Sequence, residues 1–142
     1  MEILIASDHR GFEFKQQIIK FLETQNQIVY DFGTSGTQSV DYPDYAHKLS
    51  HELKSNQFGI LICGSGIGMS IAANRHKNIR AALCRNKIDA ELSRKHNNAN
   101  VIVLGSDNTD VTDAIKIVDQ FLNTKFERGR HAERVTKINI GE

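Results

Sequence analysis

Five short apolar runs divide this chain, and longer amphipathic stretches separate them. The runs are rich in β-branched residues and leucine and lack polar alternation, as expected of strands buried on both faces of a sheet. They are Ile3–Ala6, Ile28–Tyr30, Phe58–Cys63, Ile79–Cys84 and Val101–Leu104. The stretches between them show helical spacing, for example at Val111, Ala114 and Val118. Strands that alternate with helices predict right-handed βαβ units, and therefore an α/β fold with a doubly wound, five-stranded parallel sheet of the Rossmann-like kind.

The length of 142 residues predicts a single domain, 1–142. The expected strand order is 2-1-3-4-5, which is common among doubly wound sheets. After a helix that ends near Asn123, the segment 124–142 is predicted to add a C-terminal helix. The sheet does not need this helix, so it is a candidate arm against a partner subunit.

Composition excludes several classes of protein. Charged residues make up 25% of the chain and the formal net charge is +1, so neither a nucleic-acid binder nor a polybasic membrane module is expected. The two cysteines, Cys63 and Cys84, form neither a disulfide framework nor a paired zinc-ligand spacing, which favours a reducing compartment. No run reaches about 18 consecutive apolar residues. We therefore expect a cytoplasmic protein without membrane contact.

Two loops at the ends of predicted strands concentrate the chemically active residues. In open α/β sheets, ligands bind beyond the carboxyl ends of the strands, at the point where the strand order reverses. In the expected order this point lies between the first and third strands, which end in Ser7–Gly11 and Cys63–Gly68. We therefore expect these two loops to face each other.

The glycine-rich segment CGSGIG, residues 63–68, looks like a nucleotide loop but fails both nucleotide templates. The dinucleotide fingerprint needs a glycine at the sixth position from Gly64, where Met69 stands, and the P-loop triplet Gly-Lys-Ser/Thr does not occur. The glycines do permit a row of N–H groups at the start of a helix expected over 69–75. The loop thus predicts a site for a phosphate or an oxyanion.

Cys63, at the head of this loop, has two interpretations. It is either a small buried hydrophobe at a strand end or a reactive thiol. A helix N-terminus and nearby N–H groups would lower the pKa of the thiol and supply a thiolate near neutral pH. Ser65, two residues on, is placed to hydrogen-bond it. Cys84 ends a strand without a glycine loop, so we interpret it as structural.

Three further polar residues stand at the ends of predicted elements. Asp8 either caps the helix expected over 11–26 or takes part in function with its neighbour His9. We favour function, because His9 adds a titratable group at the predicted switch point. His96 lies near the C-terminus of a helix, where the dipole stabilises a protonated imidazole. Position alone does not separate that role from a functional one.

Two histidines, His47 and His51, have the i, i+4 spacing of metal ligands. The sequence places no glutamate in the HExxH position and shows no third ligand. A solvated helix face is therefore the favoured interpretation, and His76 likewise has no partner in sequence. No metal site is expected.

Arg130 and Arg134 share a face if the C-terminal segment is helical. Like charges at that spacing repel, and an anion bound between them would remove the cost. Because Glu127 and Glu133 are close in sequence, an ordinary mixed-charge surface is slightly favoured on this evidence alone.

Six segments carry a family resemblance that spans the chain from the first strand to the tail. They are SDHRGFEFK, DYPDYA, ICGSGIGMSIAANR, IRAALC, SRKHNNANVIVLG and GRHAERV. Together they resemble the type B ribose-5-phosphate isomerases and their relatives, the galactose-6-phosphate isomerase subunits. The resemblance implies an aldose–ketose isomerase that interconverts D-ribose 5-phosphate and D-ribulose 5-phosphate through a cis-enediolate, in the non-oxidative branch of the pentose phosphate pathway. It also implies a homodimer, tetrameric in some members, with sites shared across the interface.

The resemblance also implies a role for each matching residue. Cys63 is the base that removes the proton next to the carbonyl, with Ser65 beside it, and His96 helps to open the sugar ring. The residues implied in substrate binding are Gly64, Ser65, Gly66, Ile67 and Gly68 for the enediolate oxygens, Asp8 for the sugar oxygens, Asn97 beside His96, and His9, Arg130 and Arg134 for the phosphate. No cofactor is implied. Proton transfer needs no hydride carrier, and a metal-assisted hydride shift would need a carboxylate and histidine cluster that the sequence does not show.

Two positions depart from the family pattern. Some members have a phosphate-binding arginine after the fifth strand, where this chain has Asp107 and Asn108, so fewer cations are expected at the phosphate. The residue two after the cysteine is often threonine or asparagine, and here it is Ser65. The chain keeps the Asp-His and His-Asn pairs that galactose-specific relatives tend to lose. Isomerisation of allose 6-phosphate or galactose 6-phosphate and non-catalytic sensing of a sugar phosphate are the alternatives.

Overall fold

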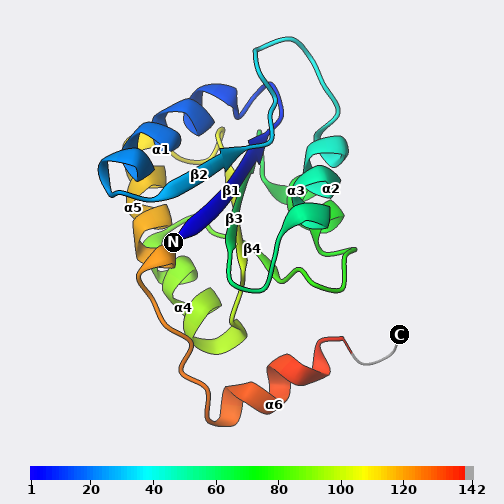
Figure 1. Cartoon of the computed structure of the whole chain (residues 1–142), viewed down its shortest axis with the longest axis vertical. Coiled ribbons are helices and arrows are strands. Elements are labelled where there is room, and N and C mark those ends of the chain that lie inside the picture. Colours follow the sequence, from blue (N-terminus) through cyan, green and yellow to red (C-terminus); the bar gives the residue numbers. More distant parts are fainter. Residues whose placement is uncertain (140–142) are drawn as a thin grey trace.

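The computed structural model describes residues 1–139, and this part of the chain alternates strands with helices (Figure 1). The strands are β1 (Glu2–Ser7), β2 (Ile28–Asp31), β3 (Phe58–Cys63), β4 (Ala81–Leu83) and β5 (Val101–Gly105). The helices are α1 (Phe12–Thr24), α2 (Tyr42–Glu52), α3 (Ile67–Ala73), α4 (Lys87–Asn97), α5 (Val111–Leu122) and α6 (Arg130–Lys137). The predicted α/β fold with a five-stranded parallel sheet and an extra C-terminal helix is confirmed.

The strand order is β2-β1-β3-β5-β4, so the predicted order 2-1-3-4-5 is wrong in its last two places. β5 lies between β3 and β4 and pairs with both. The reason is burial. Every residue of β5 is buried, whereas β4 has three residues, all of them half-buried, and short strands are tolerated at sheet edges. The sequence carries a hint of this, because the VIVL run is continuously apolar while IRAALC holds an arginine and two alanines.

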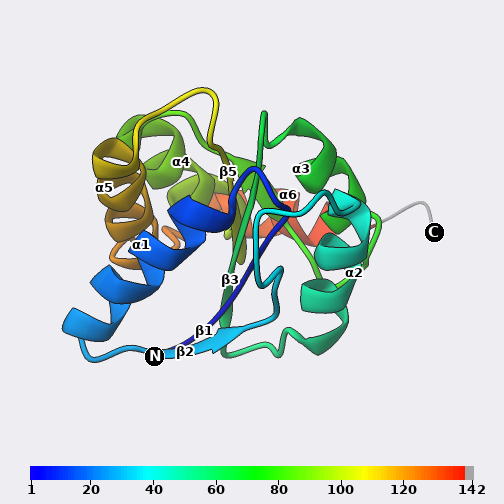
Figure 2. The ribbon, with the colours of Figure 1, turned by 90° about the horizontal axis from the view of Figure 1, so that it is seen from above.

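The helices form a layer on each face of the sheet. α1, α4 and α5 pack on one face, and α2 and α3 pack on the other (Figure 2). Alternate residues of each central strand feed the two cores, so Ile60 and Ile62 of β3 join the first and Leu61 and Cys63 join the second. Right-handed connections explain the two layers. A connection that runs across the sheet in one direction passes over one face, and a connection that runs in the other direction passes over the other face.

The C-terminal helix α6 stands apart from these layers. The segment that leads into α6 is hydrogen-bonded to α4. The Glu127 N–H donates to the Lys95 carbonyl oxygen at 3.1 Å, and Arg94 Nε donates to the Thr124 carbonyl oxygen at 3.1 Å. α6 lies near the ends at which the strands begin, away from the ends at which they finish (Figure 1). Across residues 1–139 no helix is long and apolar enough to cross a membrane.

Candidate active site

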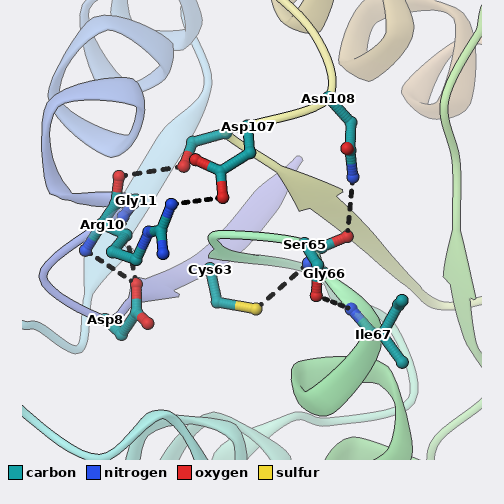
Figure 3. Close-up of polar contacts among 10 residues, drawn as sticks. Asp8, Arg10, Gly11, Cys63, Ser65, Gly66, Ile67, Asp107 and Asn108 are labelled. Atoms are coloured by element: carbon teal, nitrogen blue, oxygen red, sulfur yellow. Dashed lines mark hydrogen bonds and ion pairs between the residues drawn. The ribbon is translucent and has the colours of Figure 1, made fainter.

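Asp8 follows β1 and is only 5% exposed. Its Oδ1 atom accepts the N–H of Arg10 at 2.9 Å and the N–H of Gly11 at 3.1 Å, just before α1 begins (Figure 3). One carboxylate oxygen therefore shapes the turn that precedes the helix. The capping interpretation is wrong, because Gly11 occupies the N-cap position of α1 and no side chain caps this helix. The carboxylate still lies at the carboxyl end of the sheet, where the functional interpretation needs it, because the turn is built at the end of β1.

Cys63 ends β3, the middle strand of the sheet, and is 5% exposed. Its Sγ accepts the Gly66 N–H at 3.2 Å, and Ser65 Oγ accepts the Ile67 N–H at 3.2 Å (Figure 3). The Ser65 hydroxyl thus holds the first turn of α3, where the sequence had suggested a bond to the thiol. α3 begins at Ile67 rather than at the expected residue 69, so Gly64, Ser65 and Gly66 form the turn.

The electrostatics of Cys63 differ from the expectation. Burial raises the pKa of its thiol above the ordinary value, and the Asp8 carboxylate adds to the rise. The backbone N–H groups of Met69, Gly66 and Ser65 act in the opposite direction without outweighing burial. The prediction of a lowered thiol pKa is therefore wrong for the free protein, because desolvation is the larger effect.

Burial also raises the pKa of Cys84, to about 12. This thiol is 2% exposed and packs in the core on the α1, α4 and α5 face. It stays protonated at neutral pH, as its structural interpretation requires.

The loop after β5 contributes a part of the site that the sequence did not predict. Because β5 neighbours β3, the Asn108 Nδ2 donates to the Ser65 carbonyl oxygen at 3.1 Å, and Arg10 forms an ion pair with Asp107 across the turn (Figure 3). A Cβ atom added at Gly64 would lie 2.8 Å from Arg10 Nε. The absence of a side chain at Gly64 thus leaves room for the ion pair. The expected order 2-1-3-4-5 did not place the loop after β5 beside β3, so the sequence did not predict this contact.

His9 is oriented by the loop that follows β2. The Val40 N–H donates to His9 Nδ1 at 3.1 Å. When the ring is neutral, this bond leaves its proton on Nε2. The available Nε2–H is a hydrogen-bond donor suited to a phosphate oxygen.

The remaining predicted residues lie at the opposite end of the sheet. His96 and Asn97 end α4, just before β5 begins, and Arg130 and Arg134 lie on α6 (Figure 1). β3 spans six residues between these ends, or about 16 Å. A single chain therefore brings Asp8, His9 and Cys63 together but keeps them apart from this second group.

His131, between the two tail arginines, joins the second group and was not singled out from the sequence. Its ring stacks on His96 with centroids 4.3 Å apart and planes 18° apart. Burial, the neighbouring His96 and Arg130 lower the pKa of His131, so the ring is neutral at pH 7. The stacked, neutral ring holds His96 against α6.

Comparison with known proteins identifies the family. Residues 3–138 match the model of the Ribose/Galactose Isomerase family. The chain belongs to this family. Ribose-5-phosphate isomerase B of Escherichia coli is 40% identical over 143 residues, which cover 99% of this chain and 96% of that one.

Solved structures extend the match to the fold. Ribose-5-phosphate isomerase B of Clostridium thermocellum superposes with a TM-score of 0.94 at 48% identity, covering 97% of this chain and 95% of that one. The enzyme of Mycoplasma genitalium, solved with bound ribulose-5-phosphate, gives a TM-score of 0.89 at 42% identity, covering 96% and 93%. The family member described here is an isomerase of phosphorylated sugars.

Proposed function

We propose that this chain interconverts D-ribose 5-phosphate and D-ribulose 5-phosphate through a cis-enediolate, and that residues 1–142 form one sugar-phosphate isomerase domain. The observation that carries the proposal is the Cys63 thiol at the end of the middle strand, beside the buried Asp8 and 3.2 Å from the Gly66 N–H. A base next to backbone donors is what proton abstraction from an α-hydroxy carbonyl compound requires. The ribulose-5-phosphate bound to the Mycoplasma genitalium relative supports the choice of substrate.

In the proposed reaction, the Cys63 thiolate removes the proton from C2 of the open-chain aldose. The electrons of the C2–H bond form the C1–C2 double bond, and the negative charge moves to O1. The backbone N–H groups of residues 64–68 are the proposed donors to this oxygen, and those of Gly66 and Ile67 would first have to leave their acceptors, Cys63 Sγ and Ser65 Oγ. Transfer of a proton from O2 to O1 and return of the thiol proton to C1 then give the ketose. No electrons are gained or lost overall, so the step uses no hydride carrier.

Two copies of the chain complete the proposed site. Asp8, His9 and Cys63 lie at one end of the sheet, while His96, Asn97, Arg130 and Arg134 lie at the other. The proposed roles need both groups around one substrate, with His9 and the tail arginines on the phosphate. A homodimer with twofold symmetry satisfies this, because each copy can supply the half that its partner lacks.

The Cys63→Ala variant tests the assignment of the base. We expect kcat to fall by about 1,000-fold or more, because general base catalysis by one group contributes on that scale. Exchange of the C2 proton for solvent deuterium, followed by NMR, should be lost together with turnover. Cys84→Ala is the matched control, since that thiol lies in the core, and it should retain turnover. Unchanged turnover in Cys63→Ala would refute the assignment.

The alternatives predict other outcomes. Comparison of kcat/KM for ribose 5-phosphate, allose 6-phosphate and galactose 6-phosphate separates the proposed substrate from the six-carbon sugars. A sensor of sugar phosphates would bind ribose 5-phosphate without exchange of its C2 proton. Repeating the assay of ribose 5-phosphate with a chelator tests whether turnover is independent of metal ions.

A further inference from the structure

Three histidines meet on the face of the sheet that α2 and α3 cover. His47 and His51 lie four residues apart on α2, and His76 lies in the turn after α3. His47 Nδ1 and His76 Nε2 are 2.7 Å apart, and the His51 ring packs edge-on against His76. The sequence interpretation placed the two α2 histidines on a solvated face because no third ligand was evident. The fold supplies the third ligand.

Two of the three ring pairs have the separation of imidazoles that share one metal ion. Their centroids are 5.0 Å apart for His47 and His76 and 4.9 Å apart for His51 and His76, with interplanar angles of 57° and 81°. Two imidazoles on a tetrahedral ion, each with a metal–nitrogen bond of about 2 Å, have centroids about 5 Å apart. Binding requires the hydrogen-bonded His47 and His76 nitrogens to separate slightly and the exposed His51 ring to turn toward them.

We propose that His47, His51 and His76 form a binding site for a divalent transition-metal ion of the zinc class. Three imidazole ligands suit Zn²⁺, Ni²⁺ or Cu²⁺ and disfavour the hard ions Mg²⁺ and Ca²⁺, which prefer oxygen ligands. His47 and His76 already direct one ring nitrogen toward each other, because His47 Nδ1 lies 2.7 Å from His76 Nε2.

A second group of side chains competes for the same assignment. His96, Glu127 and His131 are the one set within residues 1–139 whose ligand atoms already lie within 4.8 Å of one another. The two rings of that set are stacked with planes 18° apart, so their lone pairs lie in two nearly parallel planes and do not converge on one ion. Arg130 and Arg134 on the same helix add positive charge near it. Geometry therefore favours the α2–α3 site.

The proposed ion would join the C-terminal ends of α2 and α3. At their other ends these helices already touch, since a Cβ atom added at Gly68 would lie 2.5 Å from the Tyr42 ring. Because both helices run from the carboxyl end of the sheet toward the end where strands begin, the ion lies away from Cys63 of the same chain. Its expected effect is on the stability of the fold.

The test is titration of the chelator-treated, full-length protein with Zn²⁺ by calorimetry. We expect one zinc ion per chain, and at about 100 times the dissociation constant a rise in Tm of about 10 °C. Co²⁺ in place of zinc should give the visible absorption bands of a tetrahedral site. The His76→Asn variant should bind zinc at least about 100-fold more weakly, because one of three protein ligands is gone.

Two controls decide between this site and its rivals. His131→Asn should bind zinc as the wild type does, whereas His51→Asn should be weakened like His76→Asn. The metal-free Tm of each variant shows that its fold is retained. Zinc affinity equal to the wild type in His76→Asn would overturn the proposal, because zinc would then be bound elsewhere, for example by the two cysteines that this variant keeps. Loss of zinc binding in His131→Asn alone would also overturn it.

Discussion

The thiol of Cys63 sets the expected pH dependence of the proposed reaction. Burial raises the pKa of the thiol, so the thiolate is a minor form at neutral pH in the free enzyme. Because the base must be deprotonated, kcat/KM for ribose 5-phosphate should increase with pH, by at most about tenfold per pH unit, and should not level off below about pH 8.5. Steady-state kinetics from about pH 6 to pH 9 measure this. A plateau already present below pH 7 would contradict it.

The turn after Cys63 depends on a glycine with positive φ. Gly66 has φ of 79°, and a Cβ atom there would lie 2.5 Å from Leu83 Cδ1 and 3.2 Å from the Leu104 backbone. We expect Gly66→Ala to lower the free energy of unfolding by about 2 kcal/mol, because it adds both backbone strain and a close contact. Urea denaturation measures the change. Gly36→Ala is the matched control, since nothing lies within 4 Å of the added Cβ, and an equal loss in both variants would contradict the prediction.

At the scale of single residues, the sequence predicted which side chains stand at strand ends. Asp8 and Cys63 face one another because the ends of adjacent parallel strands share one edge of the sheet. The Arg10–Asp107 ion pair was not predictable in this way, because it depends on β5 lying beside β3. The direction of the Cys63 pKa shift was missed because burial is decided by the whole fold.

At the scale of elements, Arg94 connects α4 to the segment that leads into α6. It is 7% exposed, donates to the Thr124 and Ala99 carbonyl oxygens at 3.1 and 2.6 Å, and lies 4.9 Å from the centre of the Phe58 ring. Arg94→Met should lower the free energy of unfolding by about 3 kcal/mol, since it leaves buried carbonyl oxygens unpaired. Because α6 carries Arg130 and Arg134, we also expect KM to rise.

The control for Arg94→Met is Arg75→Met, at an exposed position just after α3. Thermal unfolding and steady-state kinetics of both variants give the comparison. If Arg94→Met unfolds at the wild-type temperature, the connection does not hold the C-terminal segment in place.

The prediction of helices and strands succeeded where the local sequence pattern determines the structure. It failed where the structure depends on which strands pair with one another. Periodicity located α5, because an apolar stripe such as Val111, Ala114 and Val118 suffices to define a helix that packs on a sheet. The place of β4 at the edge follows from its competition with β5 for the central position, which no single segment encodes. The meeting of His47 and His76 likewise depends on the packing of α2 against α3.

At the scale of the whole molecule, the two halves of the proposed site lie at opposite ends of one sheet. This arrangement makes the proposed dimer testable without a structure of the complex. If the site combines Cys63 of one copy with His96 of another, a mixed dimer of Cys63→Ala and His96→Asn chains has one site with both defects and one site with neither. A site contained in one chain would be defective in every copy.

Co-expression of the two variants should therefore restore activity. Random pairing makes half of the dimers mixed, and one of the two sites in each mixed dimer is intact, so we expect about a quarter of the wild-type turnover. Pairing Cys63→Ala with Asp8→Asn is the matched control. Those two residues lie at the same end of the sheet, so both sites of the mixed dimer carry a defect and no activity should return. Turnover of the first pair no higher than that of its separate variants would show that the copies do not share their sites.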